Sequence, residues 1–175
     1  MPDAGKLIAL EGPDHALLDR QADEICRWLA DLGIAIDRTA EPTGGPVGAQ
    51  VRLHDQGRLH FTPQSLALLL VADRLDHLEK ENGILSLLAA GRHVLCVGYT
   101  LSAYTRLSGQ VPLDWHRHIN ARCRAPDLAL YIGPDAQALP VAGDAIAWVD
   151  AAAGEEGIAR HCRRHLSSLL SLGEA

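Results

Sequence analysis

The sequence predicts an α/β protein with a five-stranded parallel sheet and helices on both faces of the sheet. Five short apolar runs alternate along the chain with longer segments in which apolar residues recur about every 3.6 positions, as they do along one side of a helix. The apolar runs are continuous and do not alternate with polar residues, which is typical of parallel strands buried on both faces. Strands that alternate with helices favour a parallel sheet covered on both sides.

The first predicted strand is the run KLIALE at 6–11, which ends at a Gly-Pro turn. A helix is expected over 16–32, because its apolar residues recur at helical spacing and Gly33 is placed to stop it. A second strand begins at Ile34. Segment 41–48 is rich in proline and glycine, so we expect a loop there.

Pro63 opens the next predicted helix, which runs to about residue 81 and carries leucines at helical spacing. The Asn-Gly pair at 82–83 separates it from a short helix at 84–90. A third strand is expected at 94–97, between two glycines. The remaining predicted elements are strands at 128–132 and 145–149 and a closing helix over 155–170.

The ends of the predicted strands are where chemistry is expected. In open α/β sheets, ligands bind beyond the carboxyl ends of the strands. These ends also carry the most distinctive motifs of the sequence. The four positions concerned are Glu11, Thr39, Val97 and Ile132.

The composition is that of a globular protein with one domain, spanning 1–175. Its 175 residues suffice for one core, and 47% apolar with 22% charged residues argues against disorder. No apolar run approaches the roughly 20 residues of a membrane span, and no cationic segment leads into an apolar leader, so we expect a cytoplasmic protein. The net charge of -6 disfavours nucleic-acid binding, so neither nucleic acid nor membrane is an expected partner.

The cysteines and histidines do not predict a metal site. The four cysteines form no CxxC pair, so we expect reduced thiols, with Cys96 in the core and not a nucleophile. Two groups of histidine and cysteine lack a clear fourth ligand and are expected on solvated surfaces. These groups are His116, His118 and Cys123, and His161, Cys162 and His165.

The motifs at the strand ends resemble those of the thymidylate kinase family. The run LIALEGPD at 7–14, with Gln21 following, is similar to the family's first strand and phosphate loop, which read approximately EGxDGxGKTTQ. EPTGG at 41–45 resembles the second loop, and LLLVADR at 68–74 resembles the central helix with its ADR signature. The family's DRY, serine, LDW and PDL elements are matched in order at 96–99, Ser102, 113–115 and 126–128. The match covers most of 6–132 and implies a three-layer nucleotide kinase fold of the P-loop NTPase type.

The phosphate loop departs from the family pattern. With Gly12 as the first glycine of GxxxxGK[ST], the second glycine, the lysine and the hydroxyl residue fall on Leu17, Leu18 and Asp19. His15 also replaces a family glycine. The lysine neutralises phosphate oxygens and the hydroxyl holds Mg²⁺, whereas leucine has no donor and aspartate adds negative charge.

The segments that match the family's substrate-binding motifs also depart from the family pattern. Where the family has DRY, this chain has Val97-Gly98-Tyr99, so the acid and the arginine are absent. The arginine of the family's REP element is Ala40, and the aromatic residue that stacks on the base is Leu70. Only twelve residues, 133–144, stand where the family usually has a longer, arginine-containing lid.

Four residues match positions that line the monophosphate pocket of the family: Asp14, Glu41, Arg74 and Tyr99. They could form a pocket for a nucleotide-like anion. Alternatively, Asp14 caps the first helix and Arg74 pairs with Asp73, Asp76 or Glu41 as part of the fold.

The resemblance and its departures together predict a pseudoenzyme with no catalytic residue and no cofactor. The family's usual pairing implies a dimer through the 63–81 helix, with itself or with an active paralogue. One alternative is a divergent nucleotide kinase, which would use ATP and Mg²⁺ with His15, Asp19 or Arg20 as substitute groups. Another is a module that binds a nucleotide-like small molecule without chemistry.

Overall fold

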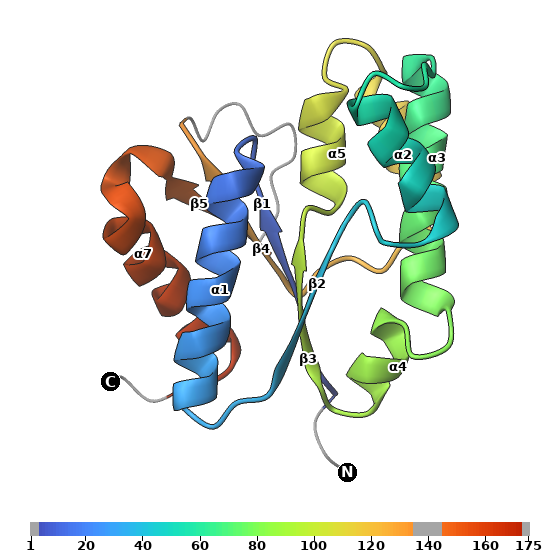
Figure 1. Ribbon diagram of the computed structural model, residues 1–175. Coiled ribbons are helices and arrows are strands. Elements are labelled where there is room, and N and C mark those ends of the chain that lie inside the picture. Colours follow the sequence, from blue (N-terminus) through green and yellow to red (C-terminus); the bar gives the residue numbers. More distant parts are fainter. Residues whose placement is uncertain (1–3, 135–144, 173–175) are drawn as a thin grey trace.

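A computed structural model describes residues 4–134 and 145–172 and shows a three-layer α/β protein (Figure 1). One sheet of five parallel strands has the order β2-β3-β1-β4-β5. The predicted fold class, a parallel sheet with helices on both faces, is therefore confirmed. The strands are β1 (Leu7–Glu11), β2 (Ile36–Ala40), β3 (His93–Val97), β4 (Leu128–Gly133) and β5 (Ile146–Asp150).

Strand β1 lies at the centre of the sheet, and all five of its residues are buried. It pairs with β3 on one side and with β4 on the other, so that Ala9 lies opposite both Cys96 and Ala129. Because all the strands are parallel, their carboxyl ends lie along one edge of the sheet. The loops after β1, β2 and β3 therefore meet there.

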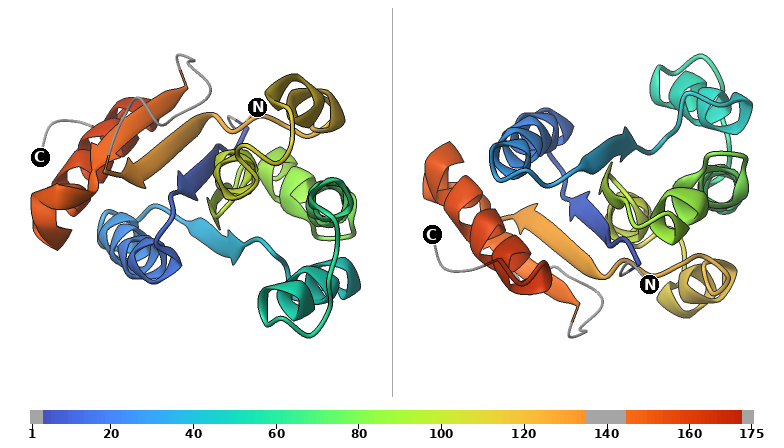
Figure 2. Two further views of the ribbon diagram at one scale, coloured as in Figure 1. Left: turned by 90° about the horizontal axis from the view of Figure 1, so that it is seen from above. Right: turned by 90° about the horizontal axis from the view of Figure 1, so that it is seen from below.

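Two helices, α1 (His15–Asp31) and α7 (Gly154–Leu169), cover one face of the sheet (Figure 2). Each presents an apolar stripe to the core, with Leu18 and Ile25 of α1 and Ile158 of α7 at 1% exposure. They pack on alternate strand residues such as Leu10. The side chains on the other face of the strands belong to a second core.

The other α-helices of the described residues lie on the opposite side of the sheet (Figure 2). The second core joins the strands to α3, α4 and α5, and a third cluster joins α2, α3 and α5. The long helix α3 contributes to both, which fixes its distance from the sheet. These helices are α2 (Pro46–Asp55), α3 (Pro63–Glu79), α4 (Ile84–Ala89), α5 (Thr100–Arg106) and α6 (Leu113–Ile119).

The structure corrects several element boundaries. The predicted loop 41–48 is wrong in its last three residues, because α2 begins at Pro46, where proline's fixed backbone suits the first turn. The second strand does not begin at Ile34, whose N–H still bonds to Leu29 at the end of α1. Helices α5 and α6 were not predicted, because these seven-residue segments, unlike the leucine-rich α4, carry few apolar residues at helical spacing.

The four cysteines are free, as predicted, and Cys96 is a core residue of β3. Within 4–134 and 145–172, the structure contains no helix long and apolar enough to cross a membrane. The predicted short lid, 133–144, falls mainly on 135–144, which lie outside the described residues.

Candidate functional site

A cavity of about 280 Å³ lies at the carboxyl edge of the sheet, between the loops after β1, β2 and β3 and the helices α3 and α5. This is where the strand-end rule places ligand sites. Its lining includes Gly12, His15, Glu41, Leu70, Arg74, Tyr99 and Ser102.

Arg74 is held from three directions, and its side chain is 1% exposed. Its Nε and Nη2 atoms donate to Oε2 of Glu41 at 2.9 and 2.8 Å, and Nη1 donates to Oδ1 of Asn120 in α6. The guanidinium carbon lies 4.6 Å from the ring centroid of Tyr99, a cation–π contact. Burial alone would lower the pKa of Arg74, but Glu41 leads the groups that raise it, so the net pKa is raised and the charge is kept.

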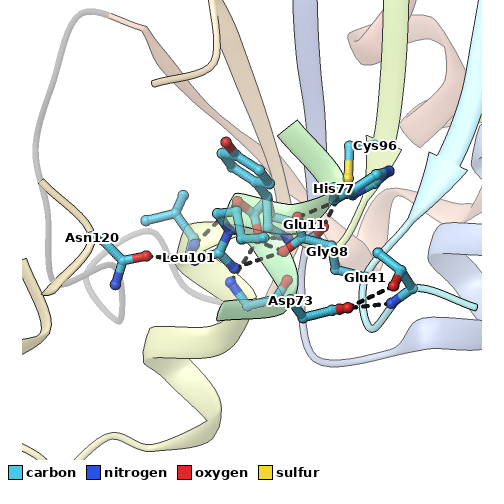
Figure 3. A network of polar contacts seen from close by, with 12 residues as sticks. Glu11, Glu41, Asp73, His77, Cys96, Gly98, Leu101 and Asn120 are labelled. Atoms are coloured by element: carbon cyan, nitrogen blue, oxygen red, sulfur yellow. Dashed lines mark hydrogen bonds and ion pairs between the residues drawn. The ribbon is translucent and has the colours of Figure 1, made fainter. Parts of the chain in front are cut away.

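The second carboxylate oxygen of Glu41 is also engaged. His77 Nδ1 lies 3.3 Å from Oε1 of Glu41, and His77 Nε2 lies 2.7 Å from the hydroxyl of Thr39. One turn earlier on α3, Asp73 accepts the N–H and the hydroxyl of Thr43 (Figure 3). Helix α3 thus fastens the segment that follows β2 through one buried acid, one buried arginine and one buried histidine.

Glu11, the last residue of β1, is fully buried and accepts three backbone hydrogen bonds. Its carboxylate bonds to the N–H groups of Tyr99, Leu101 and Ser102 at 3.0, 3.1 and 2.7 Å. These are donors at the start of α5, which lack partners within the helix. This role of Glu11 was not predicted, although a carboxylate at the end of a buried strand indicates that it has hydrogen-bond donors nearby.

Asp14 stands apart from the other three predicted pocket residues. It is exposed, it does not line the cavity, and its Oδ1 accepts the N–H of Leu17 at 3.0 Å as the N-cap of α1. The structure thus brings Glu41, Arg74 and Tyr99 together and leaves Asp14 as the helix cap that had been considered as an alternative.

Helix α1 begins at His15, so positions 17–19 lie inside its first turns. The N–H groups of Leu17 and Leu18 both bond to Asp14, through its side chain and its carbonyl, at 3.0 Å each. The Leu18 side chain is buried in the core beside β1, whereas Asp19 is exposed and pairs with Arg38 at 2.6 Å. None of these three residues lines the cavity, although His15 does.

Two glycines at the cavity are required by packing. A Cβ at Gly12, whose φ is +154°, would lie 2.3 Å from the carbonyl oxygen of Ile132. Gly98 has a φ of +73° and its N–H bonds to the carbonyl of Leu10. Both positions therefore favour glycine for backbone reasons that need no phosphate.

One group of possible metal ligands lies beside the cavity. Ligand atoms of Glu41, His77 and Cys96 are within 4.8 Å of one another, and all three residues are buried. The Cys96 thiol donates to the carbonyl of Gly98 at 3.2 Å, and burial, with Glu41 next, raises its pKa well above the usual value. A protonated thiol and a carboxylate already paired with Arg74 are poor ligands.

The two histidine and cysteine groups expected on solvated surfaces are not brought together as ligands, but the surface expectation is wrong for His116, which is 5% exposed. In the described part of the chain, neither the 116–123 group nor the 161–165 group forms a set of three close ligands. The group of Glu41, His77 and Cys96 was not predicted, because its members come from three separate segments of the chain.

Comparison with known proteins gives a consistent family. The family model for thymidylate kinase matches residues 10–144. A probable thymidylate kinase of Pyrococcus horikoshii is 32% identical over 137 residues, which cover 73% of this chain and 64% of that protein. The thymidylate kinase of Desulfotalea psychrophila is 33% identical over 130 residues, covering 73% and 63%. The chain therefore spans less than two thirds of the length of these curated relatives.

Proposed function

The chain belongs to the thymidylate kinase family, and from this premise we propose that it is a cytoplasmic pseudoenzyme, which keeps the family's fold for binding or assembly without efficient phosphoryl transfer. The observation that carries this proposal is the geometry of residues 12–19. The backbone donors of Leu17 and Leu18 are occupied by Asp14, and the side chain of Leu18 is in the core. No lysine or hydroxyl group stands at positions 17–19.

The missing groups would each cost a large factor in the rate of phosphoryl transfer. Phosphoryl transfer is catalysed almost wholly by positioning and by neutralising charge. Removal of one electrostatic donor costs on the order of 10² to 10³ in rate. The lysine, the hydroxyl and the arginines of the family's substrate side are absent together at Leu18, Asp19, Ala40 and Gly98. Neither ATP nor Mg²⁺ is therefore proposed as a cofactor.

We expect no Mg-ATP binding at the phosphate loop, because Leu17, Leu18 and Asp19 replace the glycine, the lysine and the hydroxyl residue of the family pattern. Isothermal calorimetry with ATP and Mg²⁺, followed by a coupled assay with dTMP, should give neither heat of binding nor turnover. A submillimolar dissociation constant that Asp19→Asn abolishes would overturn the proposal. Asp23→Asn is the matched control, because Asp23 is on the same helix and also pairs with Arg38.

Two other functions remain as alternatives. A divergent kinase would need other groups in place of the lost phosphate and Mg²⁺ contacts. Of the three residues considered, His15 lines the cavity, whereas Asp19 pairs with Arg38 and Arg20 pairs with Glu155 at 2.8 Å. A binding module would hold a nucleotide-like anion in the same cavity. A screen of nucleoside mono-, di- and triphosphates with and without Mg²⁺ separates the three: pseudoenzyme scaffold, kinase or binding module.

We also propose that the protein dimerises through α3, with itself or with an active paralogue. Leu68 is 51% exposed on this helix, and Leu69 and Leu75 are only partly buried. A two-fold helical interface would remove these side chains from water.

Light scattering should therefore return about twice 18.8 kDa for the wild type. Leu68→Glu should shift this to the monomer mass, because the interface would bury an unpaired carboxylate. Leu32→Glu, at a leucine that is 47% exposed beyond the end of α1, should leave the dimer intact. A wild type that stays near 18.8 kDa over a wide concentration range would rule the dimer out.

A further inference from the structure

The amino end of the central strand β1 packs closely against the start of β3. The two strands are parallel and begin at the same end of the sheet, which is the end opposite the strand-end cavity (Figure 1). Gly5 is buried there, and a Cβ at this position would lie 1.9 Å from the carbonyl oxygen of Arg92. The segment that leads into β1 therefore passes directly beside His93.

His93, the first residue of β3, accepts a backbone hydrogen bond from this segment. Its Nδ1 atom lies 3.0 Å from the backbone nitrogen of Lys6, which is 87 positions away in the chain. A backbone N–H can only donate, so Nδ1 must carry no hydrogen when this bond is made. The bond therefore requires the neutral imidazole with its hydrogen on Nε2.

Charged groups surround this imidazole on both sides of β3. On the β1 side, Lys6 lies 3.8 Å from Asp127, which also pairs with Arg124 at 2.9 Å. On the β2 side, Arg92 pairs with Asp37 of the edge strand. A proton on the ring would thus meet one nearby cation, Lys6, whose nearest acid is already shared with a second cation.

The pKa of His93 is lowered from its ordinary value. Burial is the main cause, Lys6 lowers the pKa further, and Asp127 opposes both without reversing them. The unfolded chain therefore binds a proton at His93 more readily than the folded chain does. The stability that His93 contributes is complete above about pH 6.5 and is lost as the pH falls below that value.

We propose that His93 is a pH-sensitive switch that holds the amino end of β1. The neutral ring binds the Lys6 N–H, whereas the protonated ring presents a second N–H to it, so the bond breaks and residues 5–7 loosen from β3. Glu11 lies at the far end of the strand and keeps its bonds to the start of α5. The inference is independent of the proposed function, because it concerns the opposite end of the sheet.

Amide hydrogen exchange of the full chain, expressed as protection factors at about pH 7.5 and about pH 5, tests the switch. The protection of the Lys6 amide should fall at least tenfold at the lower pH. The protection of the Tyr99 amide, which bonds to Glu11 at the other end of β1, should stay within about twofold. Nitrogen NMR of the imidazole groups should show His93 taking up its proton over the same range.

Three variants assign the effect to the ring nitrogen. His93→Asn places an oxygen acceptor near the position of Nδ1 but cannot be protonated, so Lys6 should stay protected at both pH values. His93→Phe has no acceptor, so the protection of Lys6 should be low at both pH values. His118→Asn, at an exposed histidine, should keep the pH dependence of the wild type.

The readout has to be local, because burial also lowers the pKa of His116 and of His165, and both therefore contribute to the loss of overall stability in acid. The proposal is overturned if the Lys6 amide of the wild type is equally protected at both pH values. It is also overturned if His93→Asn keeps the wild-type pH dependence. A parallel loss of protection at Tyr99 would mean that the whole domain unfolds, and this too contradicts a local switch.

Discussion

Arg74→Ala is expected to lower the free energy of unfolding by about 3–5 kcal/mol, because it leaves the buried carboxylate of Glu41 without its counter-ion. It also removes the donor to Asn120 and the cation over Tyr99. For a domain of this size the melting temperature should fall by roughly 10 °C. Urea denaturation followed by circular dichroism measures the change.

Two variants show whether geometry or charge is responsible. Arg74→Lys keeps the positive charge but cannot reach Glu41 and Asn120 in the same fork, so an intermediate loss is expected. Arg92→Ala is the control, since Arg92 pairs with Asp37 but its side chain is 54% exposed, and its loss should cost less than about 1 kcal/mol. Equal effects for Arg74→Ala and Arg92→Ala would contradict the scaffold role.

The same variant separates scaffold from ligand site. If Arg74 serves the fold, nucleotides or their analogues should not raise the melting temperature of the wild type. A nucleotide-dependent rise that disappears in Arg74→Ala, with little change in stability without ligand, would assign Arg74 to binding. Its 1% exposure and its three partners favour the scaffold outcome.

Glu11→Ala is the second substitution with a large expected effect. It removes the acceptor of three backbone N–H groups, those of Tyr99 and Leu101, which are buried, and that of Ser102, which is half-buried, and a buried donor costs about 1–3 kcal/mol when left unpaired. We expect at least about 4 kcal/mol of destabilisation in urea denaturation. Amide hydrogen exchange at the start of α5 should quicken first, because those donors lose their acceptor.

Asp14→Ala is the matched comparison, because Asp14 also accepts one backbone donor near the end of β1 but is exposed. Its loss should cost about 1 kcal/mol, as for other N-caps. If Glu11→Ala were no more destabilising than Asp14→Ala, the carboxylate of Glu11 would not organise α5, and its burial would need another explanation.

The site was only partly predictable from the sequence. Glu41, Arg74 and Tyr99 were grouped by their likeness to family motifs, and the structure brings them together. The acidic partner of Arg74 was left open among three residues, and the structure selects Glu41, while Asp73 bonds to Thr43 instead. The sequence could not rank these acidic residues as partners of Arg74, because the choice depends on how the loop after β2 packs against α3.

The five strands, the longer helices α1, α3 and α7 and the family could be predicted from the sequence, because apolar periodicity and motif order are local signals. The hydrogen bonds from the start of α5 to Glu11, 88 to 91 residues away, and the packing of Leu18 in the core are seen only in the folded chain. The same holds for the burial of His116, which is 5% exposed. Burial and hydrogen bonding at these positions depend on segments that are distant in the chain, and no window of sequence contains both partners.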